Sequence, residues 1–461
     1  MEQIIQEIVV KSISEIAKRI TKIIGNGEDF VELVEKTKEI TDKMGREICQ
    51  TVLESVDESI KKSFERKKQW HVERSNDKKT ILTKLGEITY SRTYYCSKKD
   101  GKYRYLSDDM FGIESHERID RSLEARVIEL ASEISYSSSG KKACDIQISG
   151  QTVMNKIRSL SEIKVEKIPE EKKEIEYLYI EADEDHVALQ QGGCATPRII
   201  YIHEGITSKG KRNMLLEPYY VSCLRAKPET IWEEVYEHIK NNYNTDKIKR
   251  IYLSGDGANW IKTGLDVIPK SKFVLDRYHM NKYVLKACAN NKEYRSKLWT
   301  CLNLCDKQGL EIVMEELYSK AESENKKKEL IEIKSYLLNN WAGIEIQAYE
   351  AGRVIGCSAE GHVSHLLSAR LSSRPLGWSR EGIECMARLR AFIKNGGNVY
   401  EFIKWQQKDK EIAKIGKSIL REAQRNVKRK FNEGINNIEL LKRGQKSELF
   451  LELKYLRYRA I

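Results

Sequence analysis

The sequence predicts a chain in two parts: a mainly α-helical N-terminal region containing a β-hairpin, and a mixed α/β domain carrying an all-helical insertion. Two observations support this division. The first proline is Pro169, and the residues before it place apolar side chains at helical spacing. After the charged stretch 164–176, short β-rich segments alternate with helical ones, which is typical of an α/β sheet.

The composition describes a folded chain with excess positive charge. Apolar residues make up 40% and charged residues 33%, which is typical of a globular protein, and the formal net charge is +12. Excess positive charge favours a polyanionic partner such as nucleic acid. No segment reaches the ~20 apolar residues of a membrane span, so we expect a cytoplasmic protein without a membrane partner.

Several classes of site have no support in the sequence. The ten cysteines are scattered and form no CxxC pair, which favours free thiols over a zinc site. The phosphate-binding pattern GxxxxGK[ST], a GxGxxG followed by a suitable acid, and the nucleophile pattern GxSxG are all missing. Nucleotide-driven and serine-hydrolase activities are therefore not expected.

Two long helices open the chain. Isoleucines at helical spacing predict a first helix over residues 1–24, and a second apolar stripe runs from Ile40 to Phe64. The second helix ends in a basic cluster that includes Lys67 and Lys68. This cluster is either a solvated helix end or a contact with DNA phosphates.

A β-hairpin is predicted over residues 81–106, where the apolar period changes to two. The residues Lys98 to Gly101 are a turn signal within it. The segment is rich in Tyr, Lys and Arg, and Arg92 is its candidate for contact with the DNA backbone. The same composition also fits an ordinary half-buried hairpin.

The segment ACDIQISGQTVMNKIRSL resembles the second half of a helix-turn-helix unit. Ser149 and Gly150 would form the turn before a helix. The polar and basic side chains of that helix could reach base edges in the major groove, and they are Gln151, Thr152, Asn155, Lys156 and Arg158. A plain helical hairpin is the alternative.

The α/β part has the strand order of an RNase H-like sheet, in which three neighbouring strands precede alternating helices and strands. We expect strands at 177–183, 186–190, 198–204, 217–224, 249–254 and 272–276, and helices at 230–242 and 258–264. Nearly pure helix follows from 277 to about 350. The predicted fold is therefore RNase H-like, with a helical insertion at about 277–375.

Three acidic residues stand where metal-dependent phosphodiester chemistry would need them. Asp183 ends the first of these strands, Asp256 ends the strand at 249–254, and Glu384 lies on an amphipathic helix. Carboxylates are the hard oxygen ligands that Mg²⁺ prefers, and neighbouring strand ends can bring two of them together. Asp256 could instead begin an ordinary Asp-Gly turn, and Asp185 is an alternative to Asp183.

Other acids and a histidine compete for a role at this site. Glu360 and Glu381 are alternatives to Glu384, which could equally be a surface partner of Arg388. Asp276 and His279 lie three residues apart at the start of a helix, where they could bind a metal, orient DNA or cap the helix.

Taken together, several segments give the chain a family resemblance. They are LGEITYSRTYY, YIEADEDHV, YLSGDGANWIK, VLDRYHMNKY and GCSAEGHVSHLLSARLSSRPLGWSREGIECMARLRA. With them the chain resembles bacterial insertion-sequence transposases of the ISLre type, long catalogued as an uncharacterised protein family and related to Mutator-like transposases.

The resemblance implies a DDE transposase that cleaves DNA and transfers strands with Mg²⁺, for which Mn²⁺ can substitute. The metal ligands and catalytic acids would be Asp183, Asp256 and Glu384, with Arg390 seven residues after Ile383 as the family pattern requires. Asp276 and His279 match an auxiliary signature. The partners would be double-stranded DNA, both element ends and target, and further copies of the chain in a nucleoid-associated complex.

One departure and two alternatives accompany the resemblance. Glu184 stands where the family has glycine, and an extra acid there could perturb metal binding. An RNase H-like nuclease or resolvase without strand transfer would share the same acids. A catalytically inactive DNA-binding protein would keep only the N-terminal region's role.

The predicted domain boundaries follow the changes in pattern. Residues 1–75 form a helical region suited to oligomerisation, and 76–163 form a DNA-binding region with the hairpin and the helix-turn-helix-like segment. Residues 164–176 are a linker, and 177–461 form the catalytic domain.

Overall fold

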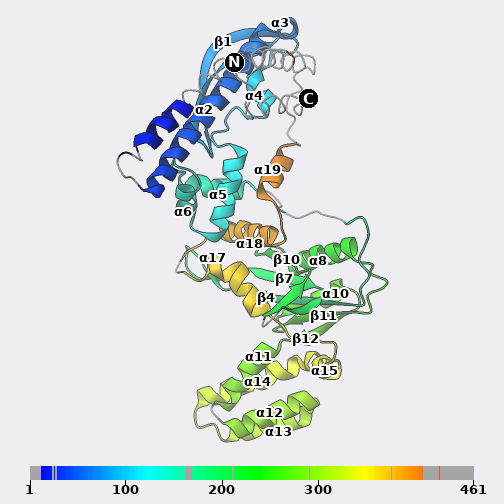
Figure 1. Cartoon of the computed structure of the whole chain (residues 1–461). Helices are drawn as coiled ribbons and strands as arrows, with labels where there is room; N and C mark the ends of the chain where they lie inside the picture. Colours follow the sequence, from blue (N-terminus) through cyan, green and yellow to red (C-terminus); the bar gives the residue numbers. More distant parts are fainter. Residues whose placement is uncertain are drawn as a thin grey trace, which may run out of the picture. The chain divides into compact units, whose positions relative to one another are not determined.

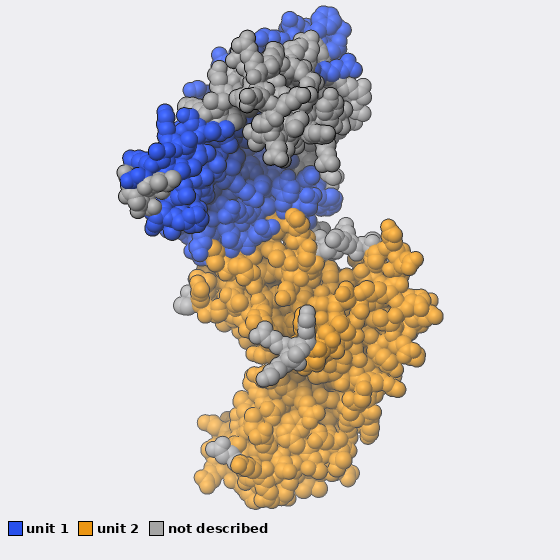
Figure 2. Space-filling view, in the orientation of Figure 1, with its two compact units in different colours: residues 1–131, 135–153, 400–461 blue, residues 132–134, 154–399 orange. Residues whose placement is uncertain are grey.

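A computed structural model describes residues 12–22, 25, 29–160, 163, 169–209, 212–289, 291–374, 376–408 and 425 (Figure 1). The chain divides into two compact units (Figure 2). Unit 1 comprises residues 1–131, 135–153 and 400–461, and unit 2 comprises 132–134 and 154–399. The division does not follow the predicted boundaries at 163 and 176, and residues 164–168 of the predicted linker lie outside the described residues.

Long helices open unit 1, as predicted. Residues 12–22 are helical, while the start of the predicted first helix lies outside the described residues. Helix α2 (Phe30–Lys62) begins where Asp29 accepts a hydrogen bond from the Glu32 N–H at 3.0 Å. Its buried stripe includes Ile40, Val56 and Ile60. The short helix α3 (Phe64–Gln69) then carries the basic cluster.

The predicted hairpin is present but larger than expected. Strand β1 (Trp70–Thr83) pairs antiparallel with β2 (Gly86–Ser97) across a two-residue turn, and Gly86 adopts φ +104° there. The predicted turn at Lys98–Gly101 is a second turn, which connects β2 to the short β3 (Tyr103–Arg104). The first half of β1 is exposed along His71–Asn76 and lacks alternation, so the sequence pattern did not reveal it.

Short helices complete the N-terminal part: α4 (Leu106–Phe111), α5 (Arg121–Glu133), α6 (Tyr136–Lys142) and α7 (Gly150–Arg158). The predicted helix after Ser149 is confirmed. The Ser149 hydroxyl accepts a hydrogen bond from the Thr152 N–H at 3.1 Å and thereby caps α7. A Cβ on Gly140 would lie 2.0 Å from the carbonyl oxygen of Ile148, so the segment before α7 passes directly against α6.

A five-stranded sheet lies at the centre of unit 2, in the order β10-β7-β4-β11-β12 (Figure 1). Its strands are β4 (Tyr177–Glu184), β7 (Arg198–His203), β10 (Tyr219–Cys223), β11 (Arg250–Gly255) and β12 (Ser271–Leu275). The strands β4, β7 and β10 pair antiparallel, and β4, β11 and β12 run parallel. All five were predicted within two residues of their observed ends.

Smaller elements flank this sheet. The pairs β5 (Val187–Ala188) with β6 (Cys194–Ala195) and β8 (Gly205–Lys209) with β9 (Arg212–Leu216) form two-stranded ribbons. Helices α8 (Pro228–Asn242), α9 (Asn259–Lys262) and α10 (Gly264–Val267) connect the strands. The strand predicted at 186–190 is therefore only the two-residue β5.

The two faces of the sheet differ in character. Leu178, Ile180 and Ala182 of β4 point into an apolar core that includes Trp232 of α8. The alternate residues Tyr179, Glu181 and Asp183 share the opposite face, since successive side chains of a strand alternate. Candidate site residues therefore lie on the polar face.

Helices dominate the rest of unit 2, as predicted for residues 277 to about 350. They are α11 (Arg277–Cys288), α12 (Lys292–Leu304), α13 (Lys307–Ser319), α14 (Glu324–Asn339) and α15 (Trp341–Tyr349). Then follow α16 (Ala359–Val363), the π-helical turn η1 (Ser364–Ser368), α17 (Ala369–Leu371) and α18 (Arg380–Lys394). Helix α19 (Val399–Lys408) begins at the last residue of unit 2 and continues in unit 1. Within the described part of the chain, no helix is long and apolar enough to cross a membrane.

Candidate functional site

Asp183 and Asp256 come together at the carboxyl ends of two neighbouring parallel strands. Ser254 of β11 is the register partner of Glu181 of β4, so Asp256 lies level with Asp183 two residues further on. Adjacent strands are ~4.8 Å apart, which places the two carboxylates within reach of one ion. Asp183 is only 8% exposed.

The electrostatics of Asp183 show that other charged groups share this edge. The pKa of Asp183 is raised to about 6, mainly by burial and further by the carboxylates of Asp256 and Glu360, while the Glu184 N–H and His279 act in the opposite direction. Burial also raises the pKa of Glu184, again with a contribution from Asp256. Mutual repulsion among these acids is what a divalent cation would relieve.

The loop that carries Asp256 is held closely from several sides. A Cβ on Gly255 would lie 2.9 Å from the carbonyl oxygen of Ala182, so only glycine allows β11 to approach β4 here. The Ala258 N–H donates to Asp256 Oδ1 at 2.9 Å, and the Tyr336 hydroxyl of α14 donates to the Asp256 carbonyl oxygen at 2.7 Å. The helical insertion thus helps to fix the second acid.

Asp276 and His279 form an ion pair beside the two acids. Asp276 is 3% exposed, and it caps α11 by accepting the Tyr278 N–H at 2.9 Å. Its Oδ2 lies 2.9 Å from Nδ1 of His279, and this hydrogen bond raises the pKa of His279, to which Asp183 and Asp256 also contribute. Of the three predicted roles, helix capping by Asp276 is confirmed, while metal binding and DNA orientation stay predictions.

Glu360 lies on α16, whose start is attached to β4 through a buried carboxylate. Glu181 is 2% exposed, and its Oε2 accepts the Ser358 N–H at 2.6 Å. The Nε2 atom of His203 lies 3.0 Å from Glu181 Oε1, and the Tyr201 hydroxyl donates to Oε2. Burial alone would raise the pKa of Glu181, but these donors hold it below its ordinary value. Glu360 itself is exposed.

Glu384 makes a different set of contacts. Its Oε2 accepts the N–H groups of Leu224 at 2.6 Å and Arg225 at 2.9 Å, and its Oε1 accepts Nε of Arg388 at 2.5 Å. Burial favours the neutral form, yet these donors lower the pKa of Glu384. Glu384 therefore connects α18 to the end of β10. In the sheet, β7 lies between β10 and β4. The structure therefore places Glu360, and not Glu384, among the charges that act on Asp183.

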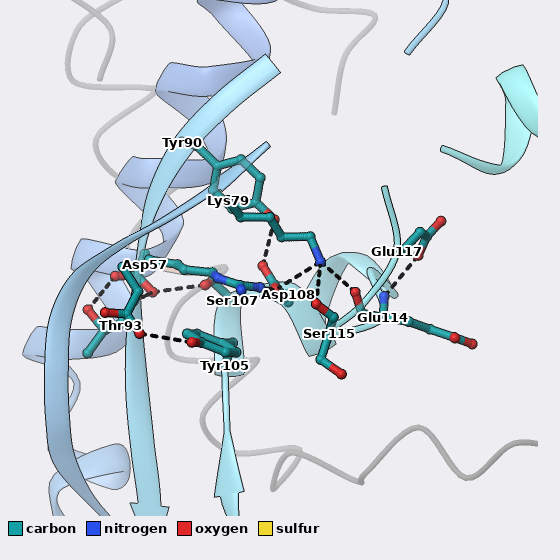
Figure 3. Close-up of polar contacts among 12 residues, drawn as sticks. Asp57, Lys79, Tyr90, Thr93, Tyr105, Ser107, Asp108, Glu114, Ser115 and Glu117 are labelled. Carbon is teal, nitrogen blue, oxygen red and sulfur yellow. Dashed lines mark hydrogen bonds and ion pairs between the residues drawn. The ribbon is translucent and has the colours of Figure 1, made fainter. Parts of the chain in front are cut away.

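Arg92 is not available for the predicted contact with DNA. It is 8% exposed, its guanidinium pairs with Asp108, and it lies 3.5 Å from the centre of the Tyr105 ring. Asp108 also accepts the Tyr90 hydroxyl at 2.6 Å and lies 3.8 Å from the Lys79 ammonium (Figure 3). Because Arg92 is buried together with its partners, its side chain cannot reach a DNA phosphate. The prediction that Arg92 contacts the DNA backbone is therefore wrong.

The same close-up shows how the hairpin attaches to α2 (Figure 3). Asp57 of α2 accepts the Thr93 N–H at 3.0 Å, the Thr93 hydroxyl at 2.6 Å and the Ser107 hydroxyl at 2.8 Å. Lys79 donates to the carbonyl oxygens of Glu114 at 2.5 Å and Ser115 at 3.2 Å. These buried polar contacts fix the hairpin through its backbone.

The remaining candidates for DNA contact differ in exposure. Lys67 and Lys68 are exposed, and Lys68 pairs with Glu65 at 3.0 Å. On α7, Gln151 and Asn155 are exposed, whereas Thr152, Lys156 and Arg158 are half-buried. Arg158 donates to the Ser379 hydroxyl at 3.0 Å and lies 3.3 Å from Glu381. Arg158 and Glu381 thus form an ion pair with each other.

The residues present suit Mg²⁺ in number and kind. Among the described residues no group of three or more His, Cys, Asp and Glu side chains is arranged as a complete metal cage. Mg²⁺ is usually held by one or two carboxylates, together with water and the phosphate oxygens of a substrate. Asp183 and Asp256 are a pair of this kind at neighbouring strand ends.

The fold and this edge define an α/β protein with acidic residues paired at neighbouring strand ends. The chain belongs to the uncharacterised protein family UPF0236, whose sequence profile matches residues 23–409. A UPF0236 protein of Caldanaerobacter subterraneus subsp. tengcongensis is 49% identical over 447 residues, which cover 96% of each chain. Another from that organism, whose name joins eleven loci, is 48% identical over 460 residues, covering 99% of this chain and 98% of the relative.

A more distant member comes from Streptococcus gallolyticus. It is named as a UPF0236 protein in the vanSb 3′ region, and it is 23% identical over 396 residues, which cover 83% of this chain and 86% of the relative. The family therefore extends along almost the whole chain in these relatives.

Proposed function

We propose that this protein is a DNA transposase of an insertion sequence, with its catalytic centre at the edge formed by Asp183 and Asp256. The observation that carries the proposal is that these two carboxylates lie next to each other at the ends of two adjacent parallel strands. Glu360 supplies the third acid in this proposal, in place of Glu384. It acts electrostatically on Asp183, whereas both oxygens of Glu384 accept hydrogen bonds from the protein.

The sheet supports an RNase H-like fold for unit 2. Three antiparallel neighbours, β4, β7 and β10, precede the parallel strands β11 and β12, and α8 lies between the two groups in sequence. The helices α11–α15 are inserted after β12 and before the helix that carries Glu360. This arrangement is the one that the resemblance to DDE transposases implies.

The chain's own residues suggest how the site would act. When bound, Mg²⁺ or Mn²⁺ would activate the attacking oxygen and stabilise the leaving oxygen at a phosphodiester. Asp183 and Asp256 would hold the ion, and Glu360 would complete the acidic edge. Asp276 raises the pKa of His279, and a protonated His279 ring would offset part of the negative charge of the acids beside a DNA phosphate.

The proposed reaction has two steps, and each forms one bond to phosphorus and breaks another. Water first attacks phosphorus at an element end, the bond from phosphorus to the 3′ oxygen breaks, and that oxygen leaves as a hydroxyl after taking a proton. The freed 3′-hydroxyl then attacks a target phosphate and displaces a second 3′ oxygen. The same acidic edge can serve both steps, because each is an in-line displacement at phosphorus.

The family context supports a mobile element. One relative's printed name joins eleven loci of a single organism, and another's name joins four. Many copies in one genome are what an insertion sequence produces by moving. The basic charge of the chain agrees with a DNA partner, and assembly of several copies on paired ends belongs to the same proposal.

A joining assay separates the proposal from its alternatives. The substrate is DNA that flanks the gene, cut beforehand to expose a 3′-hydroxyl, together with a supercoiled target plasmid and Mn²⁺. Joined products that disappear in Asp256→Asn support a transposase. Cleavage of uncut flanking DNA without joining would support the nuclease or resolvase, and binding without either reaction would support an inactive DNA-binding protein.

A further inference from the structure

A second polar pocket lies in unit 2, outside the acidic edge. Its volume is about 350 Å³, within the range of small-ligand sites. The walls come from Tyr220 of β10, His362 of α16, His365 of η1 and Lys394 of α18, together with residues 132 and 133. Neither the metal nor the DNA contacts proposed above use these side chains.

The pocket is built around a fixed guanidinium. Arg390 donates through Nε to the Leu366 carbonyl oxygen at 2.5 Å and through Nη2 to the His365 carbonyl oxygen at 2.7 Å. Its Nη1 donates to the Ser132 carbonyl oxygen and to Glu133 Oε1, the latter at 2.9 Å. Two of these hydrogen bonds hold the backbone of the π-helical turn η1. Such turns are frequent at functional sites.

The groups that remain in the pocket are donors. Burial raises the pKa of Tyr220 to about 12, so its hydroxyl keeps a proton, and that oxygen lies 3.0 Å from Nδ1 of His362. A His362 ring that accepts the Tyr220 hydroxyl at Nδ1 carries its own proton on Nε2, which makes Nε2 a donor.

The lining of the pocket combines the ammonium of Lys394 with the imidazole rings of His362 and His365. Among the described residues, no carboxylate lies within ion-pair distance of Lys394 or His365, and Glu133 is paired with Arg390. A ligand that brings negative charge and several acceptor oxygens would satisfy these donors together.

We propose that this pocket binds a phosphate group through His362, His365 and Lys394. A phosphate offers acceptor oxygens to all three donors at once and brings negative charge to the Lys394 ammonium. The phosphate could come from the DNA backbone or from a free anion or nucleotide. Helix α16 carries both Glu360 and His362, so a DNA strand at the acidic edge would have this pocket beside it along the same helix.

The test measures phosphate binding by the full-length protein with the histidine ring signals in NMR, since the chain has only eight histidines. The probes are inorganic phosphate and a 5′-phosphorylated tetranucleotide at constant ionic strength. Wild type should show saturable shifts of two histidine signals, and Lys394→Gln and His365→Gln should weaken binding at least tenfold.

Lys240→Gln is the matched control. Lys240 is also an exposed lysine in the last turn of a fifteen-residue helix of unit 2, where it lies 5.0 Å from the centre of the Tyr236 ring, outside the pocket. It should bind phosphate as wild type does. Absence of saturable binding in wild type, or equal weakening by Lys240→Gln, would overturn the proposal.

The two sources of phosphate give different results. If the DNA backbone is the source, the tetranucleotide binds more tightly than inorganic phosphate, and Lys394→Gln removes that difference. If the protein binds the tetranucleotide and inorganic phosphate with equal affinity, and Lys394→Gln weakens both to the same extent, the source is a free anion. The outcome is independent of the proposed catalysis, because Asp256→Asn should bind phosphate normally even if the chain cleaves no DNA.

Discussion

Glu181 of β4 holds the backbone of Ser358 at the start of α16, with 2.6 Å between Oε2 and the Ser358 nitrogen. This contact joins the strand that carries Asp183 to the helix that carries Glu360. The two acids are 177 residues apart in sequence (360 − 183), yet one buried carboxylate sets their relative position. Glu181 is therefore a positioning residue for the proposed centre.

Replacing Glu181 should disturb both stability and activity. Glu181→Gln weakens hydrogen bonds to a charged acceptor, which contribute ~1.5–3 kcal/mol each, so denaturant unfolding should show a loss of that order. The rate constant for DNA cleavage should fall while the Kd for DNA changes little. Glu204→Gln, a carboxylate near the same sheet that pairs with Lys173 at the surface, is the control. A cleavage rate equal to that of the control would contradict the positioning role.

The pKa of Asp183 predicts an unusual dependence of stability on pH. Its folded value of about 6 lies above the unfolded value of ~3.9, so the ionised side chain disfavours the folded state. This destabilisation is absent below pH ~4, grows between pH 4 and 6, and is complete above the folded pKa. In metal-free buffer, Asp183→Asn should therefore raise Tm at pH 7.5 and change it little at pH 4.

Thermal unfolding in a chelating buffer measures this effect. Asp246→Asn, at an exposed position of unit 2, is the control and should leave Tm unchanged at both pH values. Added Mg²⁺ should stabilise wild type at pH 7.5 but not Asp183→Asn. A lower Tm for Asp183→Asn at pH 7.5 without metal would show that the ionised Asp183 carboxylate does not destabilise the folded state.

The pair Asp276 and His279 predicts a measurable change in a histidine titration. Asp276→Asn removes the partner that contributes most to the raised pKa of His279, so the NMR titration midpoint of that ring should move down. Cleavage should fall ~10–100-fold, as for residues that support a metal site from behind its ligands. His238, whose pKa burial lowers to about 4, is an internal reference that should not move. An unchanged midpoint for His279 would refute the coupling.

Arg92 and Lys67 should behave oppositely in DNA binding. Arg92→Met breaks a buried ion pair, which costs ~3–5 kcal/mol of folding free energy, and should leave the salt dependence of DNA affinity unchanged in protein that remains folded. Lys67→Gln should leave stability unchanged and reduce the slope of log K against log salt by ~1. Fluorescence anisotropy across a salt series measures both slopes. A reduced slope for Arg92→Met would restore it as a DNA contact.

Much of the sheet could be predicted because its residues carry local signals. Apolar runs such as YLYIEA and RIYLSG predicted β4 and β11, and the acids at their ends predicted the site. The exposed half of β1 had no such signal. Arg92 lies on the same face of β2 as the buried Ile88 and Tyr90, and the partner of its buried charge is Asp108, which lies sixteen residues away in sequence.

The third acid shows the limit of local reasoning. Glu384 lies on a strongly amphipathic helix and fits a family pattern, whereas Glu360 lies in a five-residue helix with no periodicity to read. What distinguishes them is the contact between Glu181 and Ser358, which a sequence pattern does not contain. The phosphate pocket was also missed, since its side chains come from four separate segments of the sequence.

The most direct test is Mn²⁺-dependent cleavage of the DNA that flanks the gene, compared among wild type, Asp256→Asn, Glu360→Gln and Glu384→Gln. We predict cleavage with 3′-hydroxyl ends in wild type, none with Asp256→Asn or Glu360→Gln, and retained cleavage by folded Glu384→Gln. DNA binding should survive in all four proteins. Cleavage that persists in Asp256→Asn, or that depends on Glu384 and not on Glu360, would contradict the account.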